Sequence, residues 1–209
     1  MMTNIYHITH IDNLLSILNA GGLIANSRLR QERIDYCDIA HERIQDRRAR
    51  KPVPCSARGT LHDYVPFYFA PRSPMLYAIH KGNVAGYSQG QNPVIHLVSK
   101  AENIDASGLD FAFTDGHAVM EYTNFYDDLE ALGYEIDWEL MESKYWFDTE
   151  EDPDRKRRRQ AEFLVHQFCP WSLITEIGVI NNTVQTQVQQ ILQNFNHQPP
   201  VMVYSHWYY

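Results

Sequence analysis

The apolar residues of this chain fall into short runs separated by proline, glycine and polar stretches, and this pattern limits the fold more than any other feature. Three runs have helical spacing and end at glycine or polar residues. The others are typical of short strands. Since strands and helices do not alternate regularly, we predict an α+β fold rather than a parallel α/β fold. The expected strands are 4–8, 65–70, 93–98, 111–114, 162–168, 174–180 and 201–204, and the helices follow Thr9, Ser73 and Asn182.

Several local signals refine this outline. Thr9 with Asp12 three residues later has the spacing of a capping box, and Ser73 before Pro74 is a typical helix start. The arginine-rich stretch 25–60 predicts a long loop with one helical piece near 38–50, and such loops are usually functional or disordered. Further expectations are a turn at 115–117, a helix at 124–132, an irregular lobe at 133–154 and a last helix at 183–195.

Length and composition favour one domain over residues 1–209. A chain of 209 residues with 44% hydrophobic content can bury a sizeable core. The three cysteines are far apart and form neither zinc spacing nor a disulfide framework, so we expect no metal and a reducing, cytoplasmic location. No apolar run is long enough to cross a bilayer, and the N-terminus does not have the pattern of a secretory signal. Nothing demands a dimer, so we expect a monomer.

Charge is distributed unevenly along the chain. The net charge of −8 argues weakly against nucleic-acid binding, but nine of the eighteen Lys/Arg residues lie between Arg28 and Arg58 and five more at 155–159. Thirteen of the 26 acids lie between Glu121 and Asp154. If the two basic blocks meet in the fold, an acidic protein acquires a positive groove. The alternative is that acids 148–154 neutralise the neighbouring cations.

One stretch combines these features. Five consecutive cations, 155–159, lead into Glu162, which opens an apolar strand. A carboxylate beside concentrated positive charge suits a place where an anionic substrate meets an acid; a solvated charge run is the alternative. His7 ends the first strand just before a helix N-terminus, where a polar ligand can bind, although a structural role is the default interpretation for a single histidine. The cations from Arg43 to Lys51 fit either a phosphate-facing helix or a solvated face.

Several enzyme classes are disfavoured by missing motifs. The sequence contains no glycine-rich phosphate loop, no Gly-x-Gly-x-x-Gly and no Gly-x-Ser-x-Gly, and no His-x-x-x-His with a third ligand stands out. These absences argue against a P-loop ATPase, a Rossmann dehydrogenase, an α/β-hydrolase and a zinc hydrolase.

His7, Tyr68 and Glu162, placed on an early, a middle and a late strand, resemble the His-Tyr-Glu type of ADP-ribosyltransferase. The chain looks most like the DarT family of DNA ADP-ribosyltransferase toxins. The segments that carry this resemblance occur in the family's order over most of the chain. They are Tyr6-His7-Ile8-Thr9, the helix Leu14–Leu18 with Gly22-Leu23, Ile44–Ala49, Val65–Phe69, Ser73–Tyr77 and Ala161–Val165.

The resemblance implies an ADP-ribosyltransferase-like fold with central split mixed sheets and short flanking helices. It also implies transfer of ADP-ribose from NAD⁺ to thymine in single-stranded DNA, and a macrodomain antitoxin that removes the modification. Glu162 would be the catalytic acid and Arg48 its helper, although Arg47 and Arg50 lie within one turn. The cofactor-binding residues implied are His7, Thr9, Asn13, Tyr68, Met75 and Arg48. The DNA-binding residues implied are His117, Tyr145, Trp146, Arg157, Arg158 and Arg159.

These roles agree with the chemistry of the reaction. Cleavage of the ribose–nicotinamide bond develops positive charge on the sugar, which a carboxylate such as Glu162 stabilises. An aromatic face such as Tyr68 favours the cationic nicotinamide ring, and a guanidinium stabilises the thymine anion as its proton leaves. Two alternatives stay open, namely transfer to protein or RNA, and a nucleic-acid-binding module without catalysis.

Overall fold

The computed structural model describes residues 2–34, 36–37, 39 and 42–209. Most strands belong to one eight-stranded sheet of order β10-β9-β4-β1-β3-β7-β5-β6, and β2 and β8 form a separate pair. The strands are β1 Asn4–His10, β2 Gly22–Ile24, β3 Tyr64–Tyr68, β4 Val94–Lys100, β5 Phe111–His117, β6 Phe125–Tyr126, β7 Ala161–His166, β8 Phe168–Pro170, β9 Glu176–Val179 and β10 Val201–Val203.

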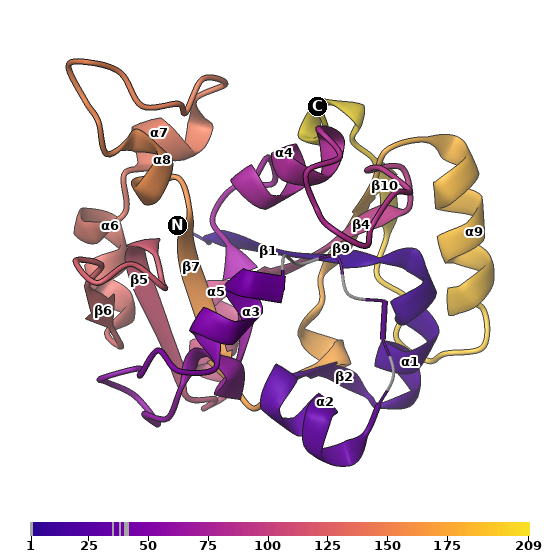
Figure 1. Cartoon of the computed structure of the whole chain (residues 1–209). Coiled ribbons are helices and arrows are strands. Elements are labelled where there is room, and N and C mark those ends of the chain that lie inside the picture. Colours follow the sequence, from indigo (N-terminus) through magenta and orange to yellow (C-terminus); the bar gives the residue numbers. More distant parts are fainter. Residues whose placement is uncertain (1, 35, 38, 40–41) are drawn as a thin grey trace.

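The sheet is split between its two central strands. β1 pairs with β4 along its whole length, from Asn4 opposite Lys100 to His10 opposite Val94. In contrast, β1 meets β3 only at Tyr6 opposite Tyr68. The β4–β1 half and the β3–β7 half therefore diverge, as Figure 1 shows. β9 and β10 pair in parallel and the other neighbours are antiparallel, so the prediction of a split, mixed sheet is confirmed.

Short helices flank the two halves of the sheet (Figure 1). α3 and α4 lie on either side of the split, and α6 to α8 form a lobe beside β5 and β7. The helices are α1 Leu14–Asn19, α2 Asn26–Glu32, α3 Glu42–Arg48, α4 Pro74–His80, α5 Ala101–Ala106, α6 Leu132–Glu135, α7 Trp138–Glu142, α8 Arg155–Arg158 and α9 Asn182–Leu192, with 3₁₀ helices at Ile11–Asn13, Leu61–Asp63, Leu129–Ala131, Trp171–Leu173 and Ser205–Trp207.

The core forms where apolar residues of the strands meet the helices. α9 buries Val184, Val188 and Leu192, which recur at helical spacing as the sequence predicted. β7 is buried over most of its length because β3 and β5 pair with it on both edges. Burial of a large apolar side chain contributes about 1.5–3 kcal/mol, so β7 is held firmly in place. The start of β7, where Glu162 lies, is consequently a rigid part of the protein.

Three sequence expectations are corrected. The first helical segment is capped by His10, whose side chain accepts from the Asp12 N–H, and not by Thr9. The capping box occurs instead at Thr60 and Asp63. The expected turn at 115–117 is a continuation of β5, which tolerates Gly116 because its register shifts there. The expected helix at 124–132 is the short strand β6 followed by a 3₁₀ turn.

The arginine-rich stretch is more ordered than the sequence predicted. It contains α2 and α3 rather than one helical piece, and the part of the expected 38–50 helix at residues 38, 40 and 41 lies outside the described residues. The expected irregular lobe at 133–154 contains most of α6 and all of α7. Within the described ranges, no helix is long and apolar enough to cross a bilayer.

Candidate active site

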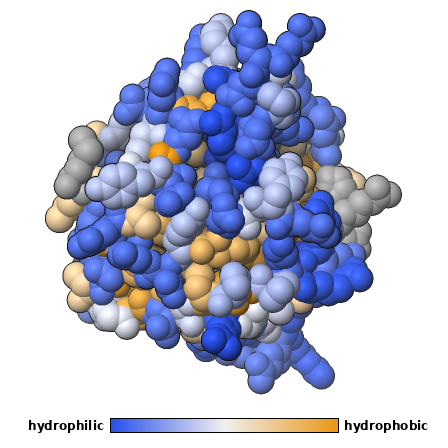
Figure 2. Space-filling model, turned by 90° about the vertical axis from the view of Figure 1, so that its left-hand side faces the viewer, coloured by the Kyte–Doolittle hydropathy of each residue, from blue (hydrophilic) through white to orange (hydrophobic). Residues whose placement is uncertain are grey.

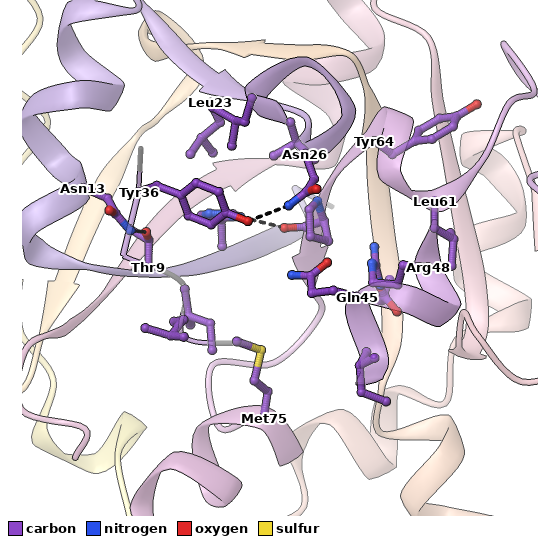
Figure 3. Close-up of a pocket in the computed structure, with 18 of the residues that line it drawn as sticks. Thr9, Asn13, Leu23, Asn26, Tyr36, Gln45, Arg48, Leu61, Tyr64 and Met75 are labelled. Carbon is purple, nitrogen blue, oxygen red and sulfur yellow. Dashed lines mark hydrogen bonds and ion pairs between the residues drawn. The ribbon is translucent and has the colours of Figure 1, made fainter. Parts of the chain in front are cut away.

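A cavity of about 420 Å³ opens at the split between β1 and β3. Its walls come from β1, α1, α2, α3, β3, α4 and the segment before β7, so chain segments far apart in sequence meet here (Figure 3). Eight residues singled out in the sequence line this one cavity, and they are His7, Thr9, Asn13, Arg48, Tyr68, Met75, His117 and Glu162.

Glu162 is the buried acid of this cavity and is only 3% exposed. It pairs with Tyr68 across the β3–β7 register, so an aromatic ring and a carboxylate leave adjacent strands side by side. One carboxylate oxygen accepts from the Arg48 guanidinium at 2.6 Å, and the other accepts from the Ala118 N–H at 3.2 Å. Burial alone would raise the Glu162 pKa, but Arg48 and His117 outweigh it and lower the pKa to about 2. The carboxylate is therefore ionised at neutral pH.

Arg48 ends α3 and reaches the acid. It is largely buried, whereas Arg47 is exposed and donates to the Val119 carbonyl, and Arg50 donates to the Asp46 carbonyl. Among the described residues, the Arg48 Nη2 atom is buried without a hydrogen-bond partner. A buried donor without a partner costs free energy, so this group is suited to donate a hydrogen bond to a ligand oxygen.

His117 lies at the end of β5, next to the acid. Its Nδ1 atom is 3.8 Å from a Glu162 carboxylate oxygen and, within the described part of the chain, has no hydrogen-bond partner. The ring thus adds a second polar group beside the carboxylate. Its position in the cavity agrees with the predicted place near the substrate, and its contact with DNA stays a prediction.

His7, Tyr68 and Met75 form the less polar wall. The His7 Nδ1 atom lies 2.8 Å from the Pro66 carbonyl, and burial lowers the His7 pKa. A neutral ring that donates from Nδ1 presents Nε2 as an acceptor. The Tyr68 hydroxyl contacts the Met75 sulfur at 3.6 Å, and burial, with a smaller effect of the Glu162 charge, raises the Tyr68 pKa. This wall suits a planar ring that carries an amide.

The side chains of Thr9 and Asn13 are hydrogen-bonded within the protein, and they hold the segment Tyr36-Cys37, which covers part of the cavity and is called the covering segment below. The Asn13 amide donates to the Thr9 hydroxyl at 3.0 Å and to the Cys37 carbonyl at 2.9 Å, and its oxygen accepts from the Cys37 N–H at 2.7 Å. Asn13 therefore fixes the backbone at residue 37 over β1. Tyr36, one position earlier, lines the cavity and accepts a hydrogen bond from Asn26, as Figure 3 shows.

Sequence reasoning missed several residues that line the cavity. Asn26 begins α2 and carries a buried amide oxygen without a partner among the described residues. Gln45 lies one turn before Arg48 and binds His62 at 3.1 Å. Lys156 and Gln160 flank the arginines before β7. The i, i+3 spacing of Gln45 and Arg48 could have indicated a shared helix face, but no sequence signal pointed to Asn26.

Two residues predicted to contact DNA are buried in the structure, which disfavours a direct contact with a strand. Trp146 is 2% exposed, and its indole N–H donates to the Tyr209 hydroxyl at 2.9 Å. Arg159 is 4% exposed and donates to backbone carbonyls, among them Met141 at 2.9 Å and Arg72 at 3.1 Å. Trp146 joins its loop to the C-terminal Tyr209, and Arg159 joins α7 to the backbone at Arg72. Each side chain is buried because these partners lie in the interior of the protein.

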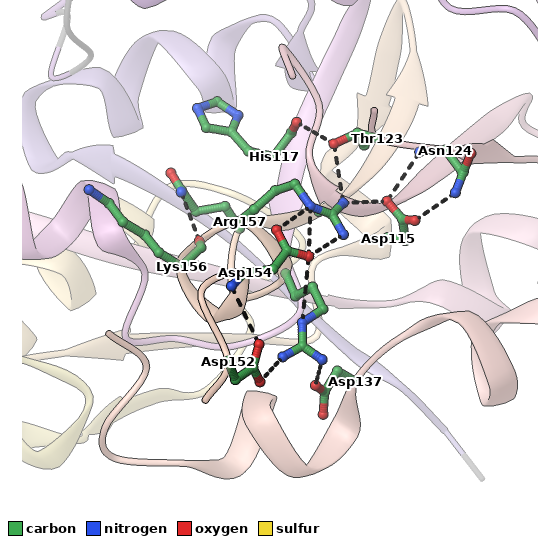
Figure 4. A network of polar contacts seen from close by, with 12 residues as sticks. Asp115, His117, Thr123, Asn124, Asp137, Asp152, Asp154, Lys156 and Arg157 are labelled. Atoms are coloured by element: carbon green, nitrogen blue, oxygen red, sulfur yellow. Dashed lines mark hydrogen bonds and ion pairs between the residues drawn. The ribbon is translucent and has the colours of Figure 1, made fainter. Parts of the chain in front are cut away.

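The neighbouring residues behave differently. Arg157 and Arg158 form ion pairs with acids of the lobe, which Figure 4 shows, and this is the neutralisation that was the alternative reading of the charge pattern. Tyr145 is 70% exposed and is free to stack on a base, so its role stays a prediction. Across the described residues, no group of three metal-binding side chains is present.

The polar atoms that line the cavity are suited to a pyridine nucleotide. Arg48 Nη2, Asn26 Oδ1 and His117 Nδ1 are buried without partners in the described part of the chain. The family model that matches residues 6–209 is described as "ssDNA thymidine ADP-ribosyltransferase, DarT". The chain belongs to the DarT family.

Individual DarT relatives agree along almost the whole chain. A DNA ADP-ribosyl transferase of Thermus aquaticus is 47% identical over 99% of this chain and 89% of its own length. One from Escherichia coli is 38% identical over 98% of this chain and 93% of its own length. A Thermus sp. 2.9 DarT solved with ADP-ribosylated ssDNA superposes with a TM-score of 0.92 at 46% identity, covering 99% of this chain and 96% of the other.

The same Thermus DarT solved in complex with NAD⁺ superposes with a TM-score of 0.88 at 44% identity, covering 99% of this chain and 98% of the other. The fold is therefore the ADP-ribosyltransferase fold that the sequence predicted. A relative in Thermosipho africanus is a DNA ADP-ribosyl transferase–DNA ADP-ribosyl glycohydrolase fusion protein. It is 26% identical over 92% of this chain, which matches 46% of the fusion.

Proposed function

We propose that this protein transfers ADP-ribose from NAD⁺ to the thymine base of single-stranded DNA and releases nicotinamide. The observation that carries the proposal is the buried Glu162–Arg48 pair, which lies in the cavity of a chain whose family is the DarT ssDNA thymidine ADP-ribosyltransferases. The complexes of the Thermus relative with NAD⁺ and with ADP-ribosylated ssDNA support both substrates.

Glu162 stabilises the positive charge that develops on the ribose as nicotinamide leaves. Its low pKa keeps it ionised, and a fixed charge in a buried site acts more strongly than one in water. Its oxygens are already oriented by Arg48 and the Ala118 N–H, so little reorganisation is required at the moment of reaction. As ionised Glu162 is an acceptor, it also receives the thymine proton as the bond between the thymine nitrogen and the sugar forms, because that nitrogen becomes acidic only then.

Arg48 activates the base electrostatically. One nitrogen is bonded to Glu162, and Nη2 is available to hold the oxygen of a thymine that has lost its proton. An arginine does not serve as the base, because its guanidinium stays protonated at all physiological pH values. His7, Tyr68 and Met75 hold the nicotinamide end, and Thr9 with Asn13 keeps the covering segment closed over it.

The protein acts as the toxin of a toxin–antitoxin pair, as a single-domain monomer. The Thermosipho fusion, which joins a transferase to a DNA ADP-ribosyl glycohydrolase, supports a partner that removes the modification. We infer that this partner is a separate macrodomain hydrolase. Coexpression with such a hydrolase is expected to relieve growth arrest, and growth arrest that persists with an active hydrolase would contradict this pairing.

The activity is tested by mass spectrometry. The protein is incubated with NAD⁺ and short oligonucleotides that either contain thymidine or have it replaced by deoxycytidine. A gain of one ADP-ribose on the thymidine strands alone supports the proposal. ADP-ribose added to RNA or to protein instead of DNA would show that the substrate is a different macromolecule. Binding of the oligonucleotide without release of nicotinamide would favour a binding module without catalysis.

A further inference from the structure

The cations of residues 155–159 are not equivalent in the structure. Arg157 donates to Asp154 and Asp115, each at 2.8 Å, and Arg159 donates to backbone carbonyls. Arg158 lies 2.8 Å from Asp137 and also pairs with an acid of the preceding loop. Each of these three side chains is therefore engaged in joining the end of the lobe around α8 to neighbouring segments.

Arg155 is also engaged. Its guanidinium donates to the Tyr145 carbonyl at 2.7 Å and lies 3.9 Å from Asp152. These contacts tie the exposed loop 143–154 back to α8. In the structure Arg155 therefore already has a carbonyl and a carboxylate partner.

Lys156 is the exception in this run. Its backbone N–H donates to Asp148 at 2.8 Å, and its carbonyl accepts from Gln160 at 2.9 Å, so both sides of the residue are fixed. Its side chain is exposed and lines the catalytic cavity, and no ion pair or hydrogen bond of the ammonium group occurs among the described residues. In Figure 4 this side chain extends away from the arginine–aspartate network.

The position of Lys156 is close to the acceptor side of the site. α8 is followed within three residues by β7, which carries Glu162, and Lys156 and His117 both line the cavity. The residues that suit the nicotinamide end lie instead on β1, β3 and α4. A cation on α8 thus lies on the side of the cavity from which we expect single-stranded DNA to bring its target thymine to the ribose of NAD⁺.

The net charge of the protein makes a cation beside the cavity important for DNA binding. The protein carries a net charge of −8, so a polyanionic strand is repelled by much of its surface and needs local cations to bind. Lys156 supplies such a cation at the cavity mouth, while the neighbouring arginines are neutralised. The arginines and the lysine differ because a guanidinium can bind a carboxylate through two parallel N–H groups, so nearby aspartates pair with the arginines first.

We propose that Lys156 binds a backbone phosphate of the single-stranded DNA beside the target thymidine, and that its arginine neighbours hold α8 in place for this contact. The inference rests on the proposed function. The same phosphate chemistry is present in the pyrophosphate of NAD⁺, so the experiment must separate the two sources.

The experiment measures the affinity of wild-type protein, Lys156→Gln and Lys156→Arg for a fluorescent thymidine oligonucleotide between about 50 and 200 mM salt. Loss of one phosphate contact on single-stranded DNA lowers the slope of log affinity against log salt by about 0.7. We expect this change for Lys156→Gln and recovery of the slope for Lys156→Arg. Lys100→Gln, which removes the same charge at the end of β4 and does not line the cavity, is the control and leaves the slope unchanged.

The KM for NAD⁺ is measured in the same variants. An unchanged KM for NAD⁺ together with the altered DNA slope supports the proposal. A raised KM for NAD⁺ with an unchanged DNA slope would assign Lys156 to the pyrophosphate and overturn it, as would equal slopes in all variants. If wild-type protein modifies no DNA at all, the proposed function itself fails, so the two failures are distinguishable.

Discussion

The guanidinium of Arg48 donates to the carboxylate of Glu162 at 2.6 Å, and both side chains are almost completely buried. The two residues come from α3 and β7, 114 positions apart in the sequence. Removing one partner from a buried pair leaves the other charge uncompensated, which is strongly destabilising. Arg48 and Glu162 therefore contribute both to the stability of the folded protein and to the proposed reaction.

Arg48→Ala and Glu162→Gln are expected to be non-additive. Arg48→Ala should lower the free energy of unfolding by about 3–5 kcal/mol because it strands a buried carboxylate. The double variant should be less destabilised than the sum of the singles, with a coupling of about 0.5–3 kcal/mol. Urea titration of the four proteins gives this coupling, and strict additivity would show that the pair does not interact in solution.

Stability should depend on pH through Glu162. Its pKa is about 2 in the folded protein and about 4.5 for the free side chain, so the unfolded chain binds the proton more readily. The stabilising contribution is therefore complete above about pH 4.5 and is lost as the pH falls from there towards 2. The difference in urea midpoint between wild type and Glu162→Gln should shrink over this window. A difference that is independent of pH from 6 down to about 3 would contradict the lowered pKa.

Gly116 should be needed for the packing of Arg157. A Cβ at position 116 would lie 2.3 Å from the Arg157 Nη1 atom and 3.0 Å from its Cγ, while Asp115 and Asp154 hold that guanidinium. Gly116→Ala should displace Arg157 and disturb His117 and the Ala118 N–H at Glu162. We expect about a tenfold to hundredfold loss of transfer, which is less than the roughly 100- to 1000-fold cost of removing one catalytic hydrogen-bond donor outright.

The control for this variant is Gly133→Ala. A Cβ there meets no atom within 4 Å, and Gly133 lies within α6, where alanine is favourable. Steady-state transfer rates of both variants at saturating NAD⁺ make the comparison. Equal rates for Gly116→Ala and Gly133→Ala would show that the Arg157 contact does not support the site.

Tyr145 and Trp146 are adjacent but should respond in opposite ways to truncation. Tyr145→Ala should weaken binding of a thymidine oligonucleotide by about 1–3 kcal/mol, the value of one stacked base, and leave the melting temperature unchanged. Trp146→Ala should instead cost about 3–5 kcal/mol of stability, because it removes a buried ring. Fluorescence anisotropy and thermal unfolding separate the two effects, and a stable Trp146→Ala with weak DNA binding would reverse the assignment.

The sequence predicted the strands and the cavity residues well, for physical reasons. β7 and β4 are continuous apolar runs, and buried strands leave that pattern unambiguously. Tyr68 and Glu162 could be placed because each lies at or next to the end of a strand, whereas His7, expected at the end of the first strand, lies in the middle of β1. Their proximity followed from the resemblance to a known family, because no local pattern reports that β1, β3 and β7 are neighbours.

The lobe was harder to predict. Whether an arginine faces a phosphate or an aspartate depends on which acids the fold brings near, and Asp115 lies 42 positions from Arg157. Trp146 similarly looks like a stacking residue in the sequence, and only the position of Tyr209 makes it a core residue. Gly116 suggested a turn because glycine is frequent in turns, whereas here it makes room for a guanidinium.

The central claim is that Glu162 in this cavity performs the transfer of ADP-ribose to thymine. The most direct measurement is the mass of a thymidine oligonucleotide after incubation with NAD⁺ and either wild-type protein or Glu162→Gln. Calorimetry measures NAD⁺ binding by each protein. Glu130→Gln, which removes an exposed acid, is the control. We predict one added ADP-ribose for wild type and for Glu130→Gln. For Glu162→Gln we predict NAD⁺ binding with transfer reduced at least about 100-fold. Undiminished transfer by a Glu162→Gln protein that binds NAD⁺ would contradict the assignment of Glu162 as the catalytic residue.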